Sequence, residues 1–568
     1  MRTLCGTILS AALAVECVSA DSDSERLNTL GAMIDVSRGR VLSVPYLKTR
    51  FERMGKMGYN AVMLYTEDTY KLDAVPKWGY MRGGYSIDDV KELKASADAN
   101  GLEMVPCIQT LGHLEKWLRW SDSVNVRCTT STLLVGDEKT YELIDRMVDF
   151  WARGVGGRRI HVGMDEAVGF WGGEYERRNG TRQKFDVFLE HLKRVCEICE
   201  KHGFAEVLVW SDMFYRMGSK THEYYDLDAT PSPDLADRVP KSVRLVYWDY
   251  YHGDKSFYEK MIDGHRALGS EPILAGGIQL WQHFLHDREK TLGTMRPMVA
   301  AARGRGVEEF FFTLWGDDGG YAIPDIALEG LFACAELAAG RTAEPTDENC
   351  ARFKAITGLD YRAMARLGDV NRHYADEWPD MVQEAAILYD DPLFCGNYRN
   401  CLVRKPSETT DRRFYCAVYM DAAWRDDGEK VMADYRRVLA DCSKLSGVPA
   451  VATDLVRVLA AKVAYEADIL AAWRTKDRAT LVRLAGTDLP VLIAKMKSFM
   501  ENYRADWYAT SQPFGFECIQ KRNAAALARL EEAKRRLDEY LSGAAKTIEE
   551  LDEAMLPFGI SQRSVIKW

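Results

Sequence analysis

Short apolar runs rich in β-branched and aromatic residues recur along the chain up to about residue 340, and amphipathic segments of helical period separate them. This alternation is typical of repeated strand–helix units, which build a parallel sheet. Eight parallel strands with helical returns close into a barrel whose active site lies at the carboxyl ends of the strands. The eight runs span residues 31–36, 60–65, 102–108, 159–163, 207–210, 243–248, 272–277 and 309–315.

After residue 340 the apolar positions follow a purely helical period. Leu455, Val458, Leu459 and Val463 are spaced i, i+3, i+4, i+8, which places them on one face of a helix. Residues 522–541 form a second run that is rich in Ala, Glu, Arg and Leu. The composition of this part favours a role in structure or assembly.

We therefore expect an α/β protein. A (β/α)8 TIM barrel occupies residues 21–340, and an all-helical C-terminal domain occupies residues 341–568. Residues 1–20 stand apart from both as a signal peptide.

The signal peptide is indicated by Arg2, by the apolar stretch that follows it, and by the small residues directly before Asp21. It predicts export to the periplasm or the medium. Glu16 and Cys17 interrupt the pattern, so a cytoplasmic location stays open as the alternative.

Charge and composition narrow the function further. The net charge is −10, and no basic run with interleaved aromatic residues occurs, so nucleic acid is not an expected partner. No stretch after the N-terminus is long and apolar enough to cross a bilayer. The ten His show no metal-ligand spacing, and we expect neither a metal nor a cofactor. The oligomeric state stays open, and a homodimer is one possibility.

Polar and aromatic residues gather at the ends of the eight runs. Because the carboxyl ends of barrel strands share one face, these side chains are candidates for a common site. They are Asp35 and Arg38, Glu67 and Asp68, Gln109 and His113, Asp165 and Glu166, Trp210 and Asp212, Tyr247 and Asp249, Trp281, and Trp315 and Asp317.

The adjacent acids Asp165 and Glu166 restrict the chemistry. Neighbours on a regular strand point to opposite faces, so both can enter one site only beyond the strand end, where Gly163 gives the backbone freedom. Retaining glycosidases with an enzyme nucleophile hold two carboxyl groups about 5–5.5 Å apart across the sugar. Immediate neighbours suit that arrangement poorly. They fit a mechanism in which the substrate itself supplies the nucleophile.

Longer motifs, in one order from about residue 30 almost to the C-terminus, resemble glycoside hydrolase family 20, in particular its bacterial β-N-acetylhexosaminidases with a helical C-terminal domain. The matching stretches are Met33-Ile-Asp-Val-Ser-Arg, Leu64-Tyr-Thr-Glu-Asp-Thr-Tyr, Gly79-Tyr-Met-Arg-Gly, Val105-Pro-Cys-Ile-Gln-Thr-Leu-Gly-His-Leu, Ile160-His-Val-Gly-Met-Asp-Glu-Ala, Val209-Trp-Ser-Asp-Met-Phe, Tyr247-Trp-Asp-Tyr-Tyr, Leu314-Trp-Gly-Asp-Asp-Gly and Gln512-Pro-Phe-Gly-Phe-Glu.

The resemblance implies an exo-β-N-acetylhexosaminidase that releases terminal β-linked GlcNAc or GalNAc from glycans. It implies a retaining, substrate-assisted mechanism through an oxazolinium intermediate. Glu166 would be the general acid and base, Asp165 would orient the acetamido group, and Tyr247 would donate to its carbonyl oxygen.

The resemblance also implies which residues surround these three. Arg38, Asp249 and Asp317 would hold the hydroxyls of the terminal sugar, and Trp210, Trp281 and Trp315 would wall the site. His113, with either Glu67 or Asp68, would form a relay behind the acid.

The chain departs from the family pattern in three places. Relatives usually carry a small α/β domain before the barrel, whereas the first strand here begins near residue 31. Many relatives have His where this chain has Val168. Gln279 stands where a second Trp is expected beside Trp281. The leaving-group side of the site is therefore the least predictable part.

Two other functions stay open. One is a catalytically inactive, glycan-binding barrel. The other is a barrel glycosidase that uses an enzyme carboxylate as its nucleophile, which the fold alone does not exclude.

Overall fold

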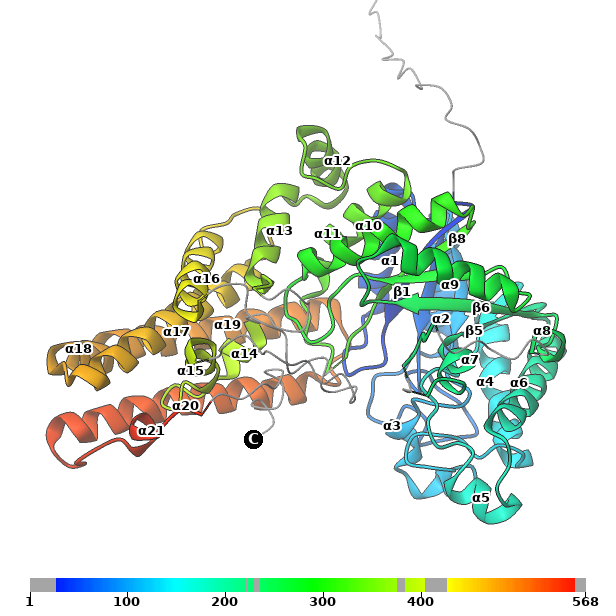
Figure 1. Ribbon diagram of the computed structural model, residues 1–568, viewed down its shortest axis with the longest axis horizontal. Coiled ribbons are helices and arrows are strands. Elements are labelled where there is room, and N and C mark those ends of the chain that lie inside the picture. Colours follow the sequence, from blue (N-terminus) through cyan, green and yellow to red (C-terminus); the bar gives the residue numbers. More distant parts are fainter. Residues whose placement is uncertain are drawn as a thin grey trace, which may run out of the picture.

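The computed structural model describes residues 27–220, 223–227, 235–317, 319–374, 384–403 and 427–556. The predicted signal peptide lies outside these residues. Eight parallel strands form one closed barrel in chain order, and a group of long helices extends away from it on one side (Figure 1). The predicted α/β barrel with a helical C-terminal region is confirmed.

The barrel strands coincide with the apolar runs of the sequence. They are β1 Thr29–Asp35, β2 Ala61–Tyr65, β3 Glu103–Cys107, β4 Arg159–His161, β5 Glu206–Trp210, β6 Val243–Asp249, β7 Ile273–Gly277 and β8 Glu309–Leu314.

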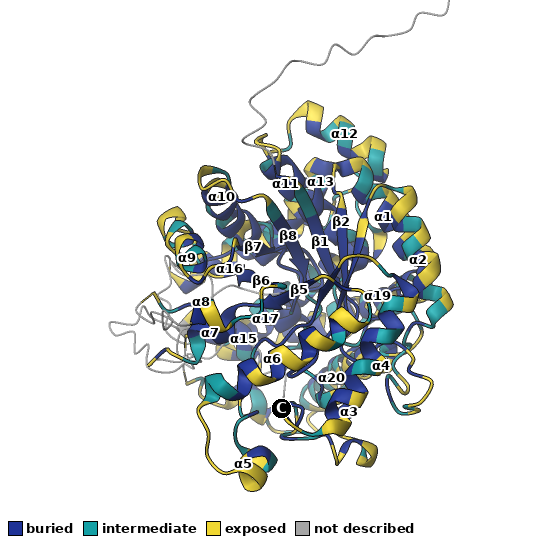
Figure 2. Cartoon of the chain, turned by 90° about the vertical axis from the view of Figure 1, so that its right-hand side faces the viewer, coloured by how far each residue is buried: buried dark blue, intermediate teal, exposed yellow. Residues whose placement is uncertain are grey.

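The outer layer consists of the returning helices, which bury one apolar face against the strands (Figure 2). Ser43 caps the first of them, and Ser86 and Asp89 form a reciprocal capping box at the start of the second, which satisfies backbone N–H groups that have no partner within the helix. The principal helices of this layer are α1 Val44–Met57, α2 Ile87–Ala99, α4 Glu138–Gly154, α6 Lys184–Lys201, α9 Lys255–Ala267, α10 Arg288–Gly304 and α11 Ala327–Ala338. Shorter helices lie in the loops: α3 Glu115–Leu118, α5 Gly173–Asn179, α7 Asp212–Arg216 and α8 Leu235–Arg238.

The C-terminal region is helical throughout its described residues, as predicted. Leu455, Val458, Leu459 and Val463 lie on α17 and are fully buried. The helices are α12 Asp347–Thr357, α13 Tyr361–Leu367, α14 Glu384–Tyr389, α15 Gly396–Val403, α16 Gly428–Cys442, α17 Ala450–Thr475, α18 Arg478–Arg483, α19 Leu489–Thr510, α20 Phe516–Ser542 and α21 Glu549–Asp552, with a 3-10 turn η4 at Gly368–Asn371 and a π-helical turn η6 at Leu484–Asp488.

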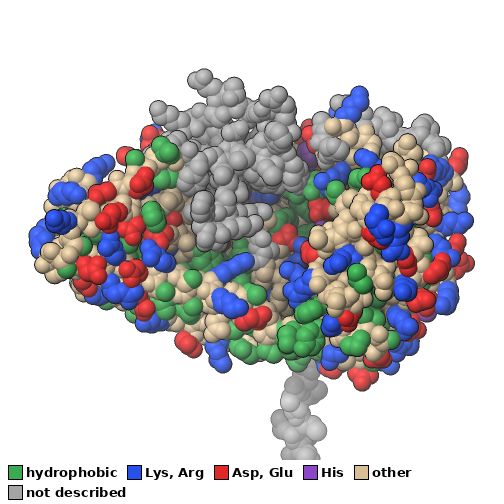
Figure 3. Space-filling model, turned by 90° about the horizontal axis from the view of Figure 1, so that it is seen from below, with side chains coloured by type: hydrophobic (Ala, Val, Ile, Leu, Met, Phe, Trp, Pro, Cys, Tyr) green, Lys and Arg blue, Asp and Glu red, His purple; other side chains and the backbone are tan. Residues whose placement is uncertain are grey.

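Acidic and basic side chains are interspersed over the face of the molecule drawn in Figure 3. Within the described residues, no helix has the length and apolarity needed to cross a membrane.

Candidate active site

The register of the strands determines which residues face the inside of the barrel. Residues paired across a parallel sheet point to the same side. A side chain at Gly276 would meet Met295 of α10, so Gly276 faces the outer helices, whereas a side chain at Gly277 would meet the rings of Trp281 and Tyr250. Following the pairs around the barrel gives the last inward residue of each strand: Asp35, Tyr65, Cys107, His161, Trp210, Trp248, Gly277 and Thr313.

Asp165 and Glu166 lie on a tight turn that follows β4. Gly163, Met164 and Glu166 all have positive φ, at 73°, 72° and 46°, a conformation that costs residues other than Gly about 1–3 kcal/mol each. The buried Gln109 holds this turn, because its Oε1 accepts from Met164 N at 3.1 Å and its Nε2 donates to Asp165 Oδ1 at 2.7 Å. The turn removes the strand alternation that would separate the two acids.

His113 faces both carboxylates and shows that they share one site. Its Nε2 lies 3.2 Å from Asp165 Oδ2 and 3.5 Å from Glu166 Oε2. Asp165 is buried, whereas 34% of the Glu166 side chain is exposed. The solvent-facing acid can therefore reach a bound ligand, while its neighbour stays anchored in the wall.

The charges of His113 and Asp165 determine each other's protonation state. Burial lowers the pKa of His113, but the carboxylates of Asp165 and Glu166 outweigh burial and raise the pKa to about 10. Burial raises the pKa of Asp165, but His113 and the Gln109 amide lower it more, so the net direction is down. At neutral pH, His113 is thus an imidazolium and Asp165 is a carboxylate.

A third acid, Asp212, is fully buried behind the turn. Asp212 Oδ2 accepts from the backbone N–H of Glu166 at 3.0 Å, and its Oδ1 accepts from Trp248 Nε1 at 3.3 Å. Burial, followed by the charge of Asp165, raises the pKa of Asp212 to about 7. Asp212 therefore holds the backbone of Glu166 rather than offering a carboxylate to solvent.

Arg38 joins two carboxylates at the barrel mouth. Its Nε lies 3.0 Å from Glu67 Oε1, and its Nη1 lies 3.1 Å from Asp317 Oδ1. The sequence left open whether Glu67 or Asp68 would form the relay with His113. Asp68 pairs with Arg82 Nε at 2.6 Å, so Glu67 is the carboxylate that faces Arg38. Burial raises the pKa of Glu67 to about 7, although Arg38 and His113 lower it.

The three predicted Trp gather around two tyrosines. The Trp315 ring centroid lies 4.7 Å from that of Tyr65 and 6.1 Å from that of Trp210. Trp315 Nε1 donates to the hydroxyl of Tyr250 at 2.8 Å, and the Trp281 ring lies edge-on to Tyr250 at 5.2 Å. Aromatic faces and polar groups thus occur together at this end of the barrel, as carbohydrate binding requires.

Tyr247 and Asp249 do not lie with these residues, which corrects the expectation from the sequence. Asp249 pairs with Gly276 and therefore points outward, and Tyr247, two residues earlier, points the same way. Tyr247 is fully buried against Tyr258 and His265 of α9, and its hydroxyl donates to Asp249 Oδ2 at 2.9 Å.

The carboxylate of Asp249 is fully used inside the protein. Its oxygens also accept from Tyr251 N at 2.9 Å, from His252 N at 3.3 Å and from His252 Nδ1 at 2.8 Å. Asp249 therefore fastens the turn after β6 and offers nothing to a sugar.

Tyr250 is a residue of this cluster that sequence reasoning missed, as is Tyr65. The hydroxyl of Tyr250 accepts from Trp315 Nε1 and its ring contacts Trp281, so Tyr250 lies among the Trp of the site. Burial, and after it the charges of Asp165 and Asp317, raise the pKa of Tyr250. Both Tyr247 and Tyr250 stand in the same motif. Only the register of β6 distinguishes them.

Comparison with known proteins adds the family. A family model described as the Glycoside Hydrolase 20C C-terminal domain matches residues 387–566. The chain is 27% identical to Hexosaminidase D of Bos taurus over 237 residues, which are 39% of this chain and 65% of that protein. It is 28% identical to Hexosaminidase D of Homo sapiens over 225 residues, which are 38% of this chain and 43% of that protein. The chain thus spans less than two thirds of either relative.

Among solved structures, the chain resembles the GH20 β-N-acetylhexosaminidase from Streptomyces coelicolor A3(2). The TM-score is 0.42 at 22% identity, over 59% of this chain and 70% of that one.

Proposed function

The chain belongs to glycoside hydrolase family 20, and from this premise we propose that it is an exo-β-N-acetylhexosaminidase that works with retention and with assistance from the substrate. It releases terminal β-linked GlcNAc or GalNAc from a glycan. The proposal rests on one observation: the backbone turn after β4 places the carboxylates of Asp165 and Glu166 beside the same His113 ring nitrogen.

Glu166 acts as the acid and base in this proposal. It is the more exposed of the two carboxyl groups, so it can protonate the departing glycosidic oxygen and later take a proton from water. Asp165, ionised beside the His113 imidazolium, accepts the acetamido N–H. That contact directs the carbonyl oxygen toward C1 and stabilises the positive charge of the oxazolinium.

Tyr250, rather than Tyr247, donates to the acetamido carbonyl oxygen. The hydroxyl oxygen of Tyr250 accepts from Trp315 Nε1, so its own proton can be given to the substrate. The carbonyl oxygen attacks C1 within the same molecule, and such proximity can be worth several kcal/mol of barrier.

Arg38 and Asp317 hold hydroxyls of the terminal sugar. The guanidinium is a rigid fork of donors, and the carboxylate accepts. The two groups lie 3.1 Å apart and bind each other, which keeps both in place for the sugar.

Substrate choice and one variant test the proposal. We expect hydrolysis of aryl β-GlcNAc and none of aryl β-glucoside, because only the first carries an acetamido group. Glu166→Gln should retain substrate binding and should lower kcat by roughly 10²–10⁴-fold for alkyl or sugar leaving groups, with a smaller loss for nitrophenol, which departs without a proton.

Each rival function gives a different result. Binding of chitobiose without turnover of either aryl substrate would indicate the inactive glycan-binding barrel. Turnover of both would indicate an enzyme nucleophile.

A further inference from the structure

Trp281, one of the aromatic residues of the candidate site, lies in the loop that follows β7. We call residues 278–287 the Trp281 loop. Its two ends are joined, since Asp287 N donates to Gln279 O at 3.0 Å. Trp281 packs edge-on against Tyr250 at 5.2 Å. A shift of this loop would therefore move the ring that packs against the ring of Tyr250.

One carboxylate of the helical region holds the middle of the Trp281 loop. Glu384, the first residue of α14, is completely buried. Its Oε1 accepts from Phe284 N at 2.6 Å and from Leu285 N at 3.0 Å, and its Oε2 lies 3.3 Å from His283 Nδ1. These three consecutive residues find their polar partner about a hundred positions further along the chain, in the other domain.

Packing reinforces the same contact. The ring of Phe284 lies among aromatic rings from outside the loop, with centroid distances of 4.7 Å to Tyr321, 6.3 Å to Tyr389, 6.0 Å to Phe499 and 5.7 Å to Tyr503. Three of these four residues belong to α14 or α19. The loop is thus packed into the helical region as well as hydrogen-bonded to it.

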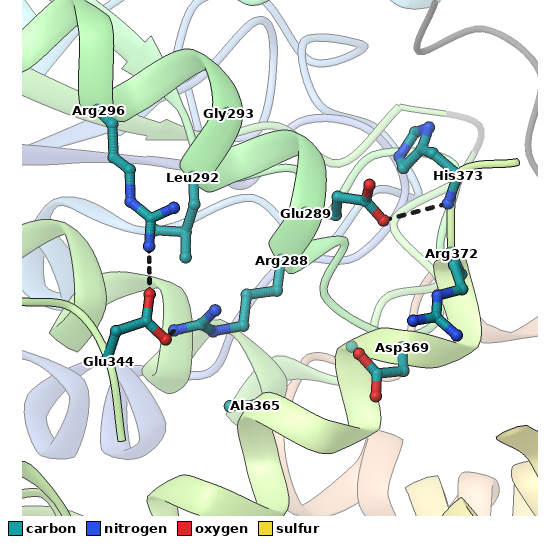
Figure 4. A pocket seen from close by; sticks show the side chains of 11 residues that line it. Arg288, Glu289, Leu292, Gly293, Arg296, Glu344, Ala365, Asp369, Arg372 and His373 are labelled. Carbon is teal, nitrogen blue, oxygen red and sulfur yellow. Dashed lines mark hydrogen bonds and ion pairs between the residues drawn. The ribbon is translucent and has the colours of Figure 1, made fainter. Parts of the chain in front are cut away.

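The end of the loop has its own partner in that region. His373 Nε2 lies 2.8 Å from Asp287 Oδ2, and Asp287 caps α10. Beyond Asp287 the first turn of α10 faces η4 and Arg372 across a cavity of about 600 Å³ (Figure 4). The cavity leaves space beside this end of the loop, whereas the Glu384 side chain has no solvent-exposed surface.

We propose that Glu384 is a positioning residue: through the Trp281 loop, it lets the helical domain set the placement of Trp281 and Tyr250 in the active site. A carboxylate that satisfies two buried N–H groups cannot be removed without leaving both unpaired. The loop must then open to water or find other partners. The effect on catalysis rests on the proposed function, whereas the effect on the loop does not.

The test compares Glu384→Ala with a matched control. Asp390 is another buried carboxylate of the helical region, and its Oδ2 accepts from the backbone N–H groups of Asn397 and Tyr398 at 2.9 and 3.2 Å. Asp390→Ala therefore removes an equivalent contact whose hydrogen bonds lie outside the Trp281 loop. Melting temperatures of both variants show whether each is folded.

Hydrogen exchange gives the first readout. We expect amide exchange of Phe284 and Leu285 to rise by roughly tenfold or more in Glu384→Ala and to stay unchanged in Asp390→Ala. Glu384→Gln, which keeps an acceptor oxygen, should fall between Glu384→Ala and the wild type. Unchanged exchange at these amides in a folded Glu384→Ala protein would overturn the proposal, whatever the enzyme does.

Kinetics gives the second readout. With an aryl β-GlcNAc substrate, kcat/KM of Glu384→Ala should fall by roughly 10- to 100-fold, since small misplacements of a positioned group have effects of this size. If Glu384 acts through Trp281, the same change in a Trp281→Phe background should cost much less. Additive losses would overturn the route through Trp281. If exchange at Phe284 and Leu285 changes in Glu384→Ala but the wild-type protein does not hydrolyse aryl β-GlcNAc, the proposed function is contradicted and the role of Glu384 in the loop is not.

Discussion

Asp165 and Glu166 face one site because the backbone between them has left the strand. Three of the four residues from Gly163 to Glu166 take positive φ, and Gln109 and Asp212 each bind a backbone N–H of this turn. The conformation is unfavourable in isolation, so these two buried side chains are as necessary to the geometry as the acids. The centre of the site thus consists of two acids and the side chains of Gln109 and Asp212, which hold the backbone of the turn.

Tyr247 in β6 and Tyr250 directly after it give a direct test of this geometry. Tyr250→Phe should lower the rate of oxazolinium formation by roughly 10²-fold, the size expected for one preorganised donor, because the acetamido oxygen loses its partner. Tyr247→Phe removes a hydroxyl of the same type from the outer face and should lower only the melting temperature, since Asp249 loses a buried donor. Single-turnover rates with aryl β-GlcNAc distinguish the two. The reverse order of effects would mean that Tyr247 is the donor.

His113 predicts a pH dependence. Its imidazolium lowers the pKa of Asp165, so His113→Asn should move the acidic limb of the kcat/KM profile to higher pH. Asn also tolerates the positive φ of this position, which is 55°. An acidic limb at the same pH in wild type and variant would show that Asp165 is not the group that titrates there.

The same residue makes a prediction for stability. The pKa of His113 rises from 6.5 to about 10 on folding, so its stabilising contribution is complete below pH 6.5 and is lost as the pH rises through about 10. Urea denaturation should therefore find a larger difference between wild type and His113→Asn at pH 6 than at pH 10. An equal difference at both values would contradict the ion pair with Asp165.

At the scale of elements, the turn after β4 depends on Gly163. A Cβ there would lie 2.2 Å from Gln109 Oε1, and φ is 73°. Gly163→Ala should displace Gln109 from Asp165 and reduce both activity and stability, the latter by about 1–3 kcal/mol. Gly156→Ala is the matched control, with φ of 63° and no atom within 3.5 Å of the added carbon except its own chain neighbours. Denaturation and kcat/KM should show a small stability loss and normal activity for the control. Full activity of Gly163→Ala would mean that the turn tolerates rearrangement.

The elements themselves could be predicted from the sequence, because strands and helices leave periodic apolar patterns. The eight barrel runs and the buried face of α17 are examples. The orientation of Tyr247 could not, because β6 is buried on both faces and either parity of Val243–Asp249 satisfies an apolar pattern. The choice between Glu67 and Asp68 stayed open for a similar reason, since it depends on where Arg82 lies in space. Long-range partners such as Glu384 leave no local pattern at all.

At the scale of the whole molecule, the helical region is joined to the loops that carry the site. Arg40 follows Arg38 by two residues, and its Nη2 lies 3.0 Å from Asp506 Oδ2 of α19 while its Nε donates to Ser511 Oγ at 3.0 Å. Its Nη1 donates to the carbonyl of Ala322, in the loop that follows Asp317. One guanidinium thus joins two loops of the candidate site to the helical region, in addition to the Glu384 contact.

Arg40→Met tests whether barrel and helical domain unfold as one unit. The variant leaves the Asp506 carboxylate charged but without its buried partner, which lowers the free energy of unfolding by about 3–5 kcal/mol. If the barrel and the helical region unfold together, both are destabilised by this loss. Calorimetry should show a single transition at lower temperature, and kcat/KM should fall with it because Arg38 and Asp317 lose a common anchor. Adding Asp506→Asn removes the unpaired charge and should restore part of the stability but not the activity, since the loops remain untied. Two transitions in Arg40→Met, one of them at the wild-type temperature, would show that the domains are independent and that the helical region does not hold the site in place.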